Sequence, residues 1–345
     1  MKIAIVNVCI PFIYGGAEFL ADSLKNKLIE YGHQAIIVKI PFKWYPPQRI
    51  IEHMLACRLL RCENVDRVIA LKFPAYYIKH PDKILWLLHQ HRQAYDLWGT
   101  PYQDIPSTPD GLRIRQTIIQ SDNAFIKEAK KIYTNSDVVS GRLKRFNGID
   151  SEVLYPPLMD AEKFRCSEFG DYLFYPSRII LGKRQYLAVE SMKYTRSGAK
   201  LIVAGHPDTP EQLEYIKSII EKNHLQSKVK IIGHWISQEE KSDLYANALG
   251  CIYIPYDEDS YGYVSLEAYQ SGKPVITCSD SGGTLAVVEN DITGYVVPPE
   301  PQALAETIDK LYFDKVQSAR LGQAGREKLS TMNITWERVM RCLAA

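Results

Sequence analysis

The sequence predicts an α/β protein built from two domains, each with a doubly wound parallel sheet. Short apolar runs alternate with helix-length segments, and this alternation starts twice along the chain. Prolines and polar residues interrupt the pattern between Tyr155 and Gly170. At 345 residues the chain is long enough for two hydrophobic cores. We therefore expect two domains that face each other across a cleft.

The first domain is expected over residues 1–160. Its predicted strands are apolar or β-branched runs at Ile3–Val8, Gln34–Val38, Arg67–Ala70, Ile84–Leu88 and Lys131–Thr134. Helical segments such as Ala17–Tyr31 and Ile114–Ala129 separate some of these strands. We interpret the amino end as the first strand and not as a signal peptide, because Asn7 interrupts its apolar run and no small-residue cleavage site follows.

The second domain is expected over residues 161–330. Its predicted strands are Tyr172–Tyr175, Lys200–Ala204, Val229–Ile232, Gly250–Ile254, Pro274–Thr277 and Gly294–Val296, joined by helices such as Pro210–Asn223 and Gln238–Ala246. Residues 331–345 hold a last helix at Ile334–Leu343, which the pattern alone assigns to neither domain.

Composition excludes several classes of function. The 42 basic and 40 acidic residues give a net charge of +2, so no strong field favours a nucleic-acid partner. No run of about eighteen residues is free of charge, which argues against a membrane span. The seven cysteines include no Cys-x-x-Cys pair and are expected to be free thiols. We expect a soluble, cytoplasmic protein.

The strongest indication of a ligand site is the segment Ile252–Gly283. Two apolar strands flank an acidic, glycine-containing loop and a helix, and ligands of parallel sheets bind where loops leave the carboxyl ends of strands. Seven residues separate Asp259 from Glu267, and Tyr261, Gly262 and Tyr263 stand at the expected start of the helix. The alternative is a solvated acidic loop before a helix N-terminus.

Two cations follow the first strand of the second domain. Arg178 and Lys183 can bracket a diphosphate, the first as a fork of donors and the second as a point charge. The alternative is a pair of solvated surface cations. Gly233, at another strand end, permits close backbone approach to a ligand, and Trp235 beside it could either stack on a base or pack.

Two further loops of the first domain carry candidate residues. Gly15 and Gly16 follow the first strand and could aim backbone N–H groups at an anion, or form a tight turn; they lack the three-glycine spacing of dinucleotide-binding proteins, so a dehydrogenase is disfavoured. His89 and His91 point the same way in an extended segment, but no third ligand has a metal-site spacing. We predict no metal site.

An ordered set of residues resembles the signature of the retaining, GT-B fold glycosyltransferase family 4. The set is Asp259, Gly262, Glu267, Ala268, Ser271-Gly272 and Pro274-Val275. The resemblance covers nearly the whole chain and is strongest from Tyr175 to Gly294. It implies the GT-B fold, with two Rossmann-like domains and a terminal helix that commonly crosses back to the first.

The resemblance also implies roles for the candidate residues. Arg178 and Lys183 would hold the donor pyrophosphate, Glu267 the ribose hydroxyls, and the loop of Gly233, Trp235 and Ile236 the base. Asp259 would contact the donor sugar, with the adjacent Glu258 as the alternative. Gly15 and Gly16 would approach the donor from the opposite wall, and His89 would face the sugar. Ala286 departs from the family, which often has a carboxylate there.

The expected function is transfer of a hexosyl group from a UDP-sugar or GDP-sugar to an acceptor hydroxyl with retained configuration, and with no metal ion or other cofactor at the chemical step. The acceptor would be a sugar, a lipid-linked molecule or a protein, as in polysaccharide or glycoconjugate synthesis. A sugar-nucleotide epimerase and a non-catalytic nucleotide-sugar-binding scaffold remain alternatives. The segment Lys39–Pro47 mixes cations with aromatics, which suits a lipid headgroup boundary, a carbohydrate or an ordinary packed loop. We therefore include peripheral contact with the inner face of the plasma membrane among the expected interactions of this protein.

Overall fold

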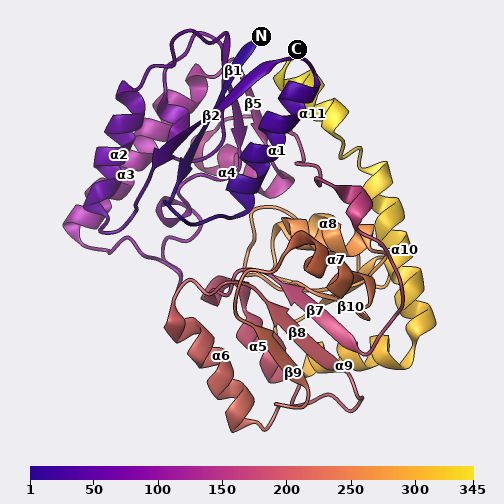
Figure 1. Cartoon of the computed structure of the whole chain (residues 1–345). Coiled ribbons are helices and arrows are strands. Elements are labelled where there is room, and N and C mark those ends of the chain that lie inside the picture. The colour runs from indigo at the N-terminus through magenta and orange to yellow at the C-terminus, as the bar shows by residue number, and fades with distance from the viewer. The chain divides into compact units, whose positions relative to one another are not determined.

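The computed structural model describes residues 1–345, which form two compact units (Figure 1). Unit 1 comprises Met1–Pro157 together with Ile334–Ala345, and unit 2 comprises Leu158–Asn333. Each unit is built around a sheet of six strands in which every recorded strand pair is parallel. The predicted class, α/β with doubly wound parallel sheets, is confirmed.

The strands of unit 1 lie in the order β2-β1-β3-β4-β5-β6. Their bounds are β1 Lys2–Cys9, β2 Gln34–Pro41, β3 Arg67–Ala70, β4 Lys83–Leu87, β5 Lys131–Thr134 and β6 Glu152–Val153. The strand order reverses between β1 and β3, which makes this the topological switch point of unit 1. The helices are α1 Gly16–Glu30, α2 Gln48–Leu59, α3 Pro109–Phe125, α4 Asp137–Asn147 and α11 Trp336–Leu343.

Helix α11 is the terminal helix of the chain and returns to unit 1. The Arg67 guanidinium of β3 donates to the carbonyl oxygens of Leu343 and Ala345, at 2.9 and 2.8 Å. Arg338 of α11 donates to the carbonyl of Val153 in β6, at 3.1 Å. These contacts join the last residues of the chain to two strands of the first sheet.

The strands of unit 2 lie in the order β12-β11-β10-β7-β8-β9, so its switch point lies between β7 and β10. The bounds are β7 Tyr172–Pro176, β8 Lys200–Ala204, β9 Val229–Ile232, β10 Gly250–Ile252, β11 Val275–Cys278 and β12 Gly294–Val297. The helices are α5 Gln185–Ser191, α6 Pro210–Lys222, α7 Gln238–Ala246, α8 Gly262–Gln270, α9 Pro301–Phe313 and α10 Lys315–Thr331.

Some element bounds differ from the sequence-based prediction for identifiable reasons. Helix α3 begins five residues before the predicted Ile114 because the Thr108 hydroxyl caps the backbone N–H of Gly111, at 3.3 Å, and Pro109 occupies the first helical position. Strand β2 continues to Pro41, three residues beyond the predicted end at Val38. Since β2 is an edge strand, the missing N–H of Pro41 leaves no interior ladder bond unmade.

Candidate functional site

The candidate site of unit 2 lies at its topological switch point. The loop after β7 carries Arg178 and Lys183, and the loop after β10 carries Asp257 to Ser260. Because β7 and β10 are neighbouring parallel strands, their carboxyl ends meet at one edge of the sheet. The structure therefore places the predicted cations and the predicted acids on adjacent loops.

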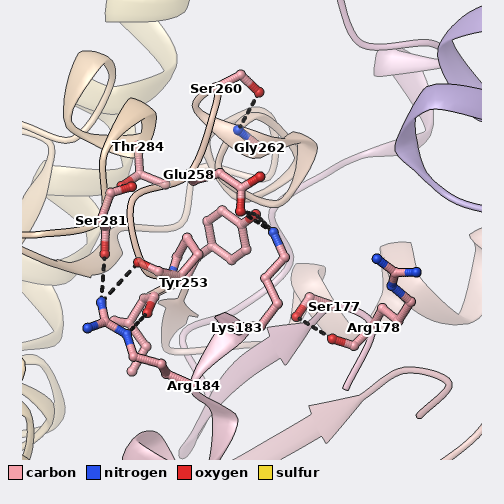
Figure 2. A network of polar contacts seen from close by, with 12 residues as sticks. Ser177, Arg178, Lys183, Arg184, Tyr253, Glu258, Ser260, Gly262, Ser281 and Thr284 are labelled. Carbon is pink, nitrogen blue, oxygen red and sulfur yellow. Dashed lines mark hydrogen bonds and ion pairs between the residues drawn. The ribbon is translucent and has the colours of Figure 1, made fainter. Parts of the chain in front are cut away.

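Lys183 is fixed from both ends (Figure 2). Its ammonium donates to the Tyr253 hydroxyl at 2.8 Å and forms an ion pair with the Glu258 carboxylate. Its backbone carbonyl accepts a hydrogen bond from the buried Tyr175 hydroxyl. The ammonium is thus held between two strand ends by groups that leave it partly exposed, with 18% of the side chain accessible.

Glu258, the acid next to Asp259, forms the ion pair with Lys183. The backbone of Glu258 also joins the loop after β11, since its N–H donates to Ser281 at 3.2 Å and its carbonyl accepts from Gly283 at 2.8 Å. Asp259 lies in the same loop and is half-buried. Glu258 therefore has a defined position beside a cation. The sequence alone left open whether Asp259 or Glu258 would contact the donor sugar.

Arg184 is a residue of this site that sequence reasoning missed. Its guanidinium is buried and makes a bidentate ion pair with Asp280, at 2.7 and 2.8 Å. It also donates to the carbonyls of Ile254 and Pro255, at 2.8 and 2.9 Å. One side chain thus ties together the loops after β7, β10 and β11. Its position directly after Lys183 gives no indication of burial.

Arg178 is more exposed, and its guanidinium lies 3.3 Å from the Asp208 carboxylate. Figure 2 shows the side chains of Arg178 and Lys183 leaving the same loop. Gln185, in the first turn of α5, holds that loop by donating to the Ser177 hydroxyl at 2.8 Å and to the Arg178 carbonyl at 2.9 Å. The loop backbone is therefore fixed while the guanidinium stays accessible.

Glu267 is buried in α8 with 4% of its surface accessible, and it forms an ion pair with Lys241 of α7. Lys241 is the second functional candidate that sequence reasoning missed. A lysine four residues into a helix with charged neighbours looks like an ordinary surface residue, and only the packing of α7 beside α8 brings it to Glu267. The pair gives the Glu267 carboxylate in α8 a fixed orientation.

Glycines let the three loops of the switch point pack together. A Cβ on Gly262 would lie 2.5 Å from the Tyr253 ring, and one on Gly283 would lie 2.5 Å from the backbone of Ser260. Gly262 also has φ +68°, and its N–H faces the Ser260 hydroxyl at 3.4 Å. Tyr261 beside it is buried and Tyr263 half-buried. A larger residue would require movement of the Tyr253 ring at Gly262 and of the Ser260 backbone at Gly283.

The predicted base-binding loop follows β9, the edge strand beyond β8. Gly233 lies in a surface cavity of about 520 Å³ that is also lined by Leu213, Lys217, Lys230, Ile231, Ile232, His234 and Glu240. Trp235 has 69% of its surface exposed, and Ile236 is half-buried. The tryptophan ring thus lies outside the core.

In unit 1, Gly15 is the N-cap of α1. Its N–H donates to the Glu18 carboxylate at 3.0 Å, and Glu18 in turn forms an ion pair with Lys72, after β3, at 3.1 Å. Gly16 is the first residue of α1. The Glu18 side chain therefore caps the start of its own helix by accepting from the N–H of Gly15.

The two histidines have different environments. The Nδ1 atom of His89 lies 2.8 Å from the Gln90 carbonyl, whereas His91 is buried against Phe73 with ring centroids 5.0 Å apart. Burial, with a smaller contribution from His89, lowers the pKa of His91 to about 3, so its ring is neutral. No three His, Cys, Asp or Glu side chains are grouped so as to hold a metal ion.

Two parallel-sheet units, one with cations and acids gathered at its switch point, are typical of α/β proteins that bind a ligand at that edge. Residues 162–328 match the model of the family described as Glycosyl transferases group 1. The match falls within the second unit and covers just under half of the chain, and the predicted resemblance is confirmed over that unit.

Comparison with individual proteins agrees with this assignment. The human alpha-1,3/1,6-mannosyltransferase ALG2 is 30% identical over 209 residues, which cover 54% of this chain and 50% of ALG2. The match thus spans about half the length of that relative. The structure of sucrose-phosphate synthase from Thermosynechococcus elongatus superposes with a TM-score of 0.78 at 17% identity, over 99% of this chain and 96% of that one. Anabaena Alr3699/HepE, solved with UDP-glucose, gives 0.74 at 16% identity, over 100% and 98%.

These structural likenesses show the fold alone, and they confirm the predicted GT-B fold. The family match and the relatives' names support the predicted class, a glycosyltransferase. Separately, none of the helices is both long and apolar enough to cross a membrane.

Proposed function

We propose that this protein is a glycosyltransferase that moves a hexosyl group from a nucleoside diphosphate sugar to an acceptor hydroxyl. The observation that carries the proposal is the position of Lys183, held by Tyr253 and Glu258 at the switch point of unit 2. A fixed, partly exposed ammonium at this edge suits the diphosphate of a donor. The family match over residues 162–328 and the UDP-glucose complex of Anabaena Alr3699/HepE support the same donor class.

In this proposal each side chain has a separate task. Arg178 and Lys183 stabilise the negative charge that develops on the leaving diphosphate, so the stabilisation acts where charge appears in the transition state. Glu267, oriented by Lys241, accepts hydrogen bonds from the ribose hydroxyls, since a carboxylate presents two acceptor oxygens. The departing phosphate takes the acceptor proton, and the anomeric configuration is retained. Two side-chain cations beside the diphosphate supply the charge that a divalent ion would otherwise provide, so we propose that the step needs no metal.

The donor sugar has two candidate acids and one candidate histidine. Asp259 and Glu258 lie on the loop beside Lys183, and we propose that this loop contacts the sugar hydroxyls. His89, in the loop after β4, is proposed to face the sugar as well. The exposed Trp44 and Tyr45 follow β2 and offer aromatic surface for a sugar, lipid-linked or protein acceptor.

Calorimetric titration with UDP and with GDP tests the donor site. We expect one nucleotide to bind the wild-type protein and both Glu267→Ala and Arg178→Ala to weaken it by roughly tenfold or more, about 1.4 kcal/mol. Glu306→Ala and Arg326→Ala, which remove exposed charges from α9 and α10, are the matched controls and should bind like wild type. If neither nucleotide binds, or if the site variants bind like the controls, the donor site is wrongly assigned.

Donor turnover with and without an acceptor separates this proposal from its alternatives. Transfer requires an acceptor hydroxyl, whereas an epimerase alters the donor alone and a scaffold binds the donor without turnover. Product release that depends on added acceptor is the expected result. Donor conversion without acceptor would support the epimerase, and binding without any conversion would support the scaffold.

A further inference from the structure

Helix α2 of unit 1 has apolar side chains on two faces. Ile50, Met54 and Cys57 are buried in the core of the unit. On its outer side, Leu55 and Leu59 are 58% and 67% exposed, and Leu60, directly after the helix, is 38% exposed. Leu55 and Leu59 are four residues apart and so share one face. We call Leu55, Leu59 and Leu60 the leucine patch.

A basic cavity adjoins the leucine patch. It has a volume of about 380 Å³ and is lined by Arg61, Lys79, His80, Pro81 and Glu128. Arg61 follows Leu60 directly in the chain, and its backbone pairs with that of Lys79. The backbone therefore places the leucine patch next to the cavity. The chain forms one surface with an apolar part and a cationic part.

The cavity carries an excess of positive charge. Arg61 and Lys79 have no carboxylate within ion-pair distance. Glu128 is shared by two cations: the Arg58 guanidinium contacts it through two nitrogens at 2.7 Å each, and the buried Lys83 ammonium lies at 3.5 Å. The lining of the cavity thus holds two cations and one carboxylate, and that carboxylate is already paired with Arg58 and Lys83 outside the lining.

His80 adds no charge to this count. Its Nδ1 atom accepts from the Asp82 N–H at 3.1 Å, and its Nε2 atom lies 3.3 Å from the Val65 carbonyl, where it donates. A ring that accepts at one nitrogen and donates at the other is neutral. The arginine and lysine side chains alone therefore give the cavity its charge.

We propose that the leucine patch and the basic cavity form a docking surface for an anionic lipid bilayer. The leucines enter the boundary between headgroups and acyl chains, and the cavity receives the phosphate of an anionic headgroup. The charge of the cavity favours a bilayer as the partner. An anionic bilayer has negatively charged headgroups over an apolar interior, and these match the unpaired Arg and Lys side chains and the exposed leucines. The surface involves no residue of the proposed donor site in unit 2, so it stands or fails independently of the proposed function.

Sedimentation with lipid vesicles tests this proposal on the full-length protein. We expect the wild type to partition at least tenfold more strongly to vesicles of phosphatidylglycerol and phosphatidylcholine in equal parts than to phosphatidylcholine alone. The difference should shrink as salt is raised, because salt screens the headgroup potential. The double variant Leu55→Asn with Leu59→Asn should lose partitioning at least tenfold. Arg61→Ala with Lys79→Ala should lose the preference for anionic vesicles.

Leu112→Asn is the matched control. Leu112 is 49% exposed and lies near the start of α3, whose other end touches α2 through Phe125, with the Arg58 guanidinium 4.0 Å from its ring centroid (Figure 1). Phe125 lies thirteen positions after Leu112, about 20 Å along the helix. The control should partition like wild type, and thermal unfolding of all variants monitors folding.

Several outcomes would overturn the proposal. They are equal partitioning of the wild type to anionic and neutral vesicles, no partitioning at all, and leucine variants that behave like Leu112→Asn while remaining folded. Saturable binding of inorganic phosphate to the cavity without vesicle binding would identify an anion site for a soluble ligand instead. Pulldown of a protein through the leucine patch without vesicle binding would identify a protein interface instead.

Discussion

Each unit has one switch point, where the strand order reverses, but the two switch points differ in chemistry. In unit 1 an ion pair between Glu18 and Lys72 joins the first turn of α1 to the loop after β3. In unit 2 the loops after β7 and β10 gather Lys183, Glu258 and the buried Arg184. A shared topology brings loops together, and the residues in those loops decide what the edge can bind.

The packing of the two edges differs as well. A Cβ on Gly15 in unit 1 would meet only the end of the Glu18 side chain, at 3.3 Å. A Cβ on Gly283 in unit 2 would lie within 2.7 Å of three Ser260 backbone atoms. The unit 2 edge is thus fixed by backbone-to-backbone packing, as expected of a preorganised site. The unit 1 edge can adjust through a flexible side chain.

The largest predicted effect is on the chemical step. Replacing Lys183 with Ala removes the cation that stabilises the leaving diphosphate, and kcat should fall by roughly 10²–10³-fold, as for loss of one transition-state donor. Lys72→Ala, the matched change at the unit 1 switch point, should lower kcat by less than about tenfold. Single-turnover kinetics with saturating donor measures both. Equal losses would mean that the two edges contribute equally to catalysis.

A buried carboxylate of unit 1 extends the comparison to the pH dependence of the free energy of unfolding. Asp122 accepts hydrogen bonds from the hydroxyls of Tyr76, Tyr77 and Tyr95, at 2.7 to 2.9 Å, and it has no cation partner, unlike Glu267 in unit 2. Burial raises the pKa of Asp122 to about 6, against the contrary effect of these hydrogen bonds. Hydroxyls therefore offset only part of the cost of burying the charge.

The sign of the effect follows from that raised pKa. The folded state binds the Asp122 proton more tightly than the unfolded state, so this proton stabilises the folded protein. The stabilisation is fully present below pH 3.8 and is lost as pH rises through about 6. The loss is on the order of 3 kcal/mol in the free energy of unfolding. Urea unfolding of wild type and Asp122→Asn from pH 4 to 7 measures the difference between them. A difference that does not change with pH would show that Asp122 titrates normally.

Glycine substitutions test the contrast in packing. Gly283→Ala should destabilise unit 2 by about 1–3 kcal/mol, the usual cost of overpacking, and should weaken nucleotide binding because the acidic loop must move. Gly15→Ala should cost less than about 1 kcal/mol, since the Glu18 side chain can give way. Chemical denaturation gives both values. A tolerated Gly283→Ala would show that the loop after β11 is not packed as described.

The fold and part of the site could be predicted from the sequence because they depend on local patterns. Apolar runs and helix caps fix the strands and helices, and a strand end fixes the edge at which Arg178 and Lys183 emerge. Arg184 and Lys241 could not be predicted in this way. Each looks like an ordinary surface cation in the sequence, and only packing between elements distant in the chain buries the first against Asp280 and brings the second to Glu267. The choice between Glu258 and Asp259 likewise depends on the backbone pairing of their loop with Gly283.

The smallest predicted effect concerns Lys241, which we place as a positioning residue. Lys241→Met keeps the length of the side chain and removes the ammonium, leaving Glu267 in place but less firmly oriented. We expect nucleotide affinity to fall by roughly threefold to tenfold, about 0.7–1.4 kcal/mol, less than for Glu267→Ala. Lys241→Arg should restore most of the affinity because it restores the ion pair. If Lys241→Met binds the nucleotide as tightly as wild type while Glu267→Ala does not, then the packing of α8 alone orients Glu267 and the ion pair has no part in binding.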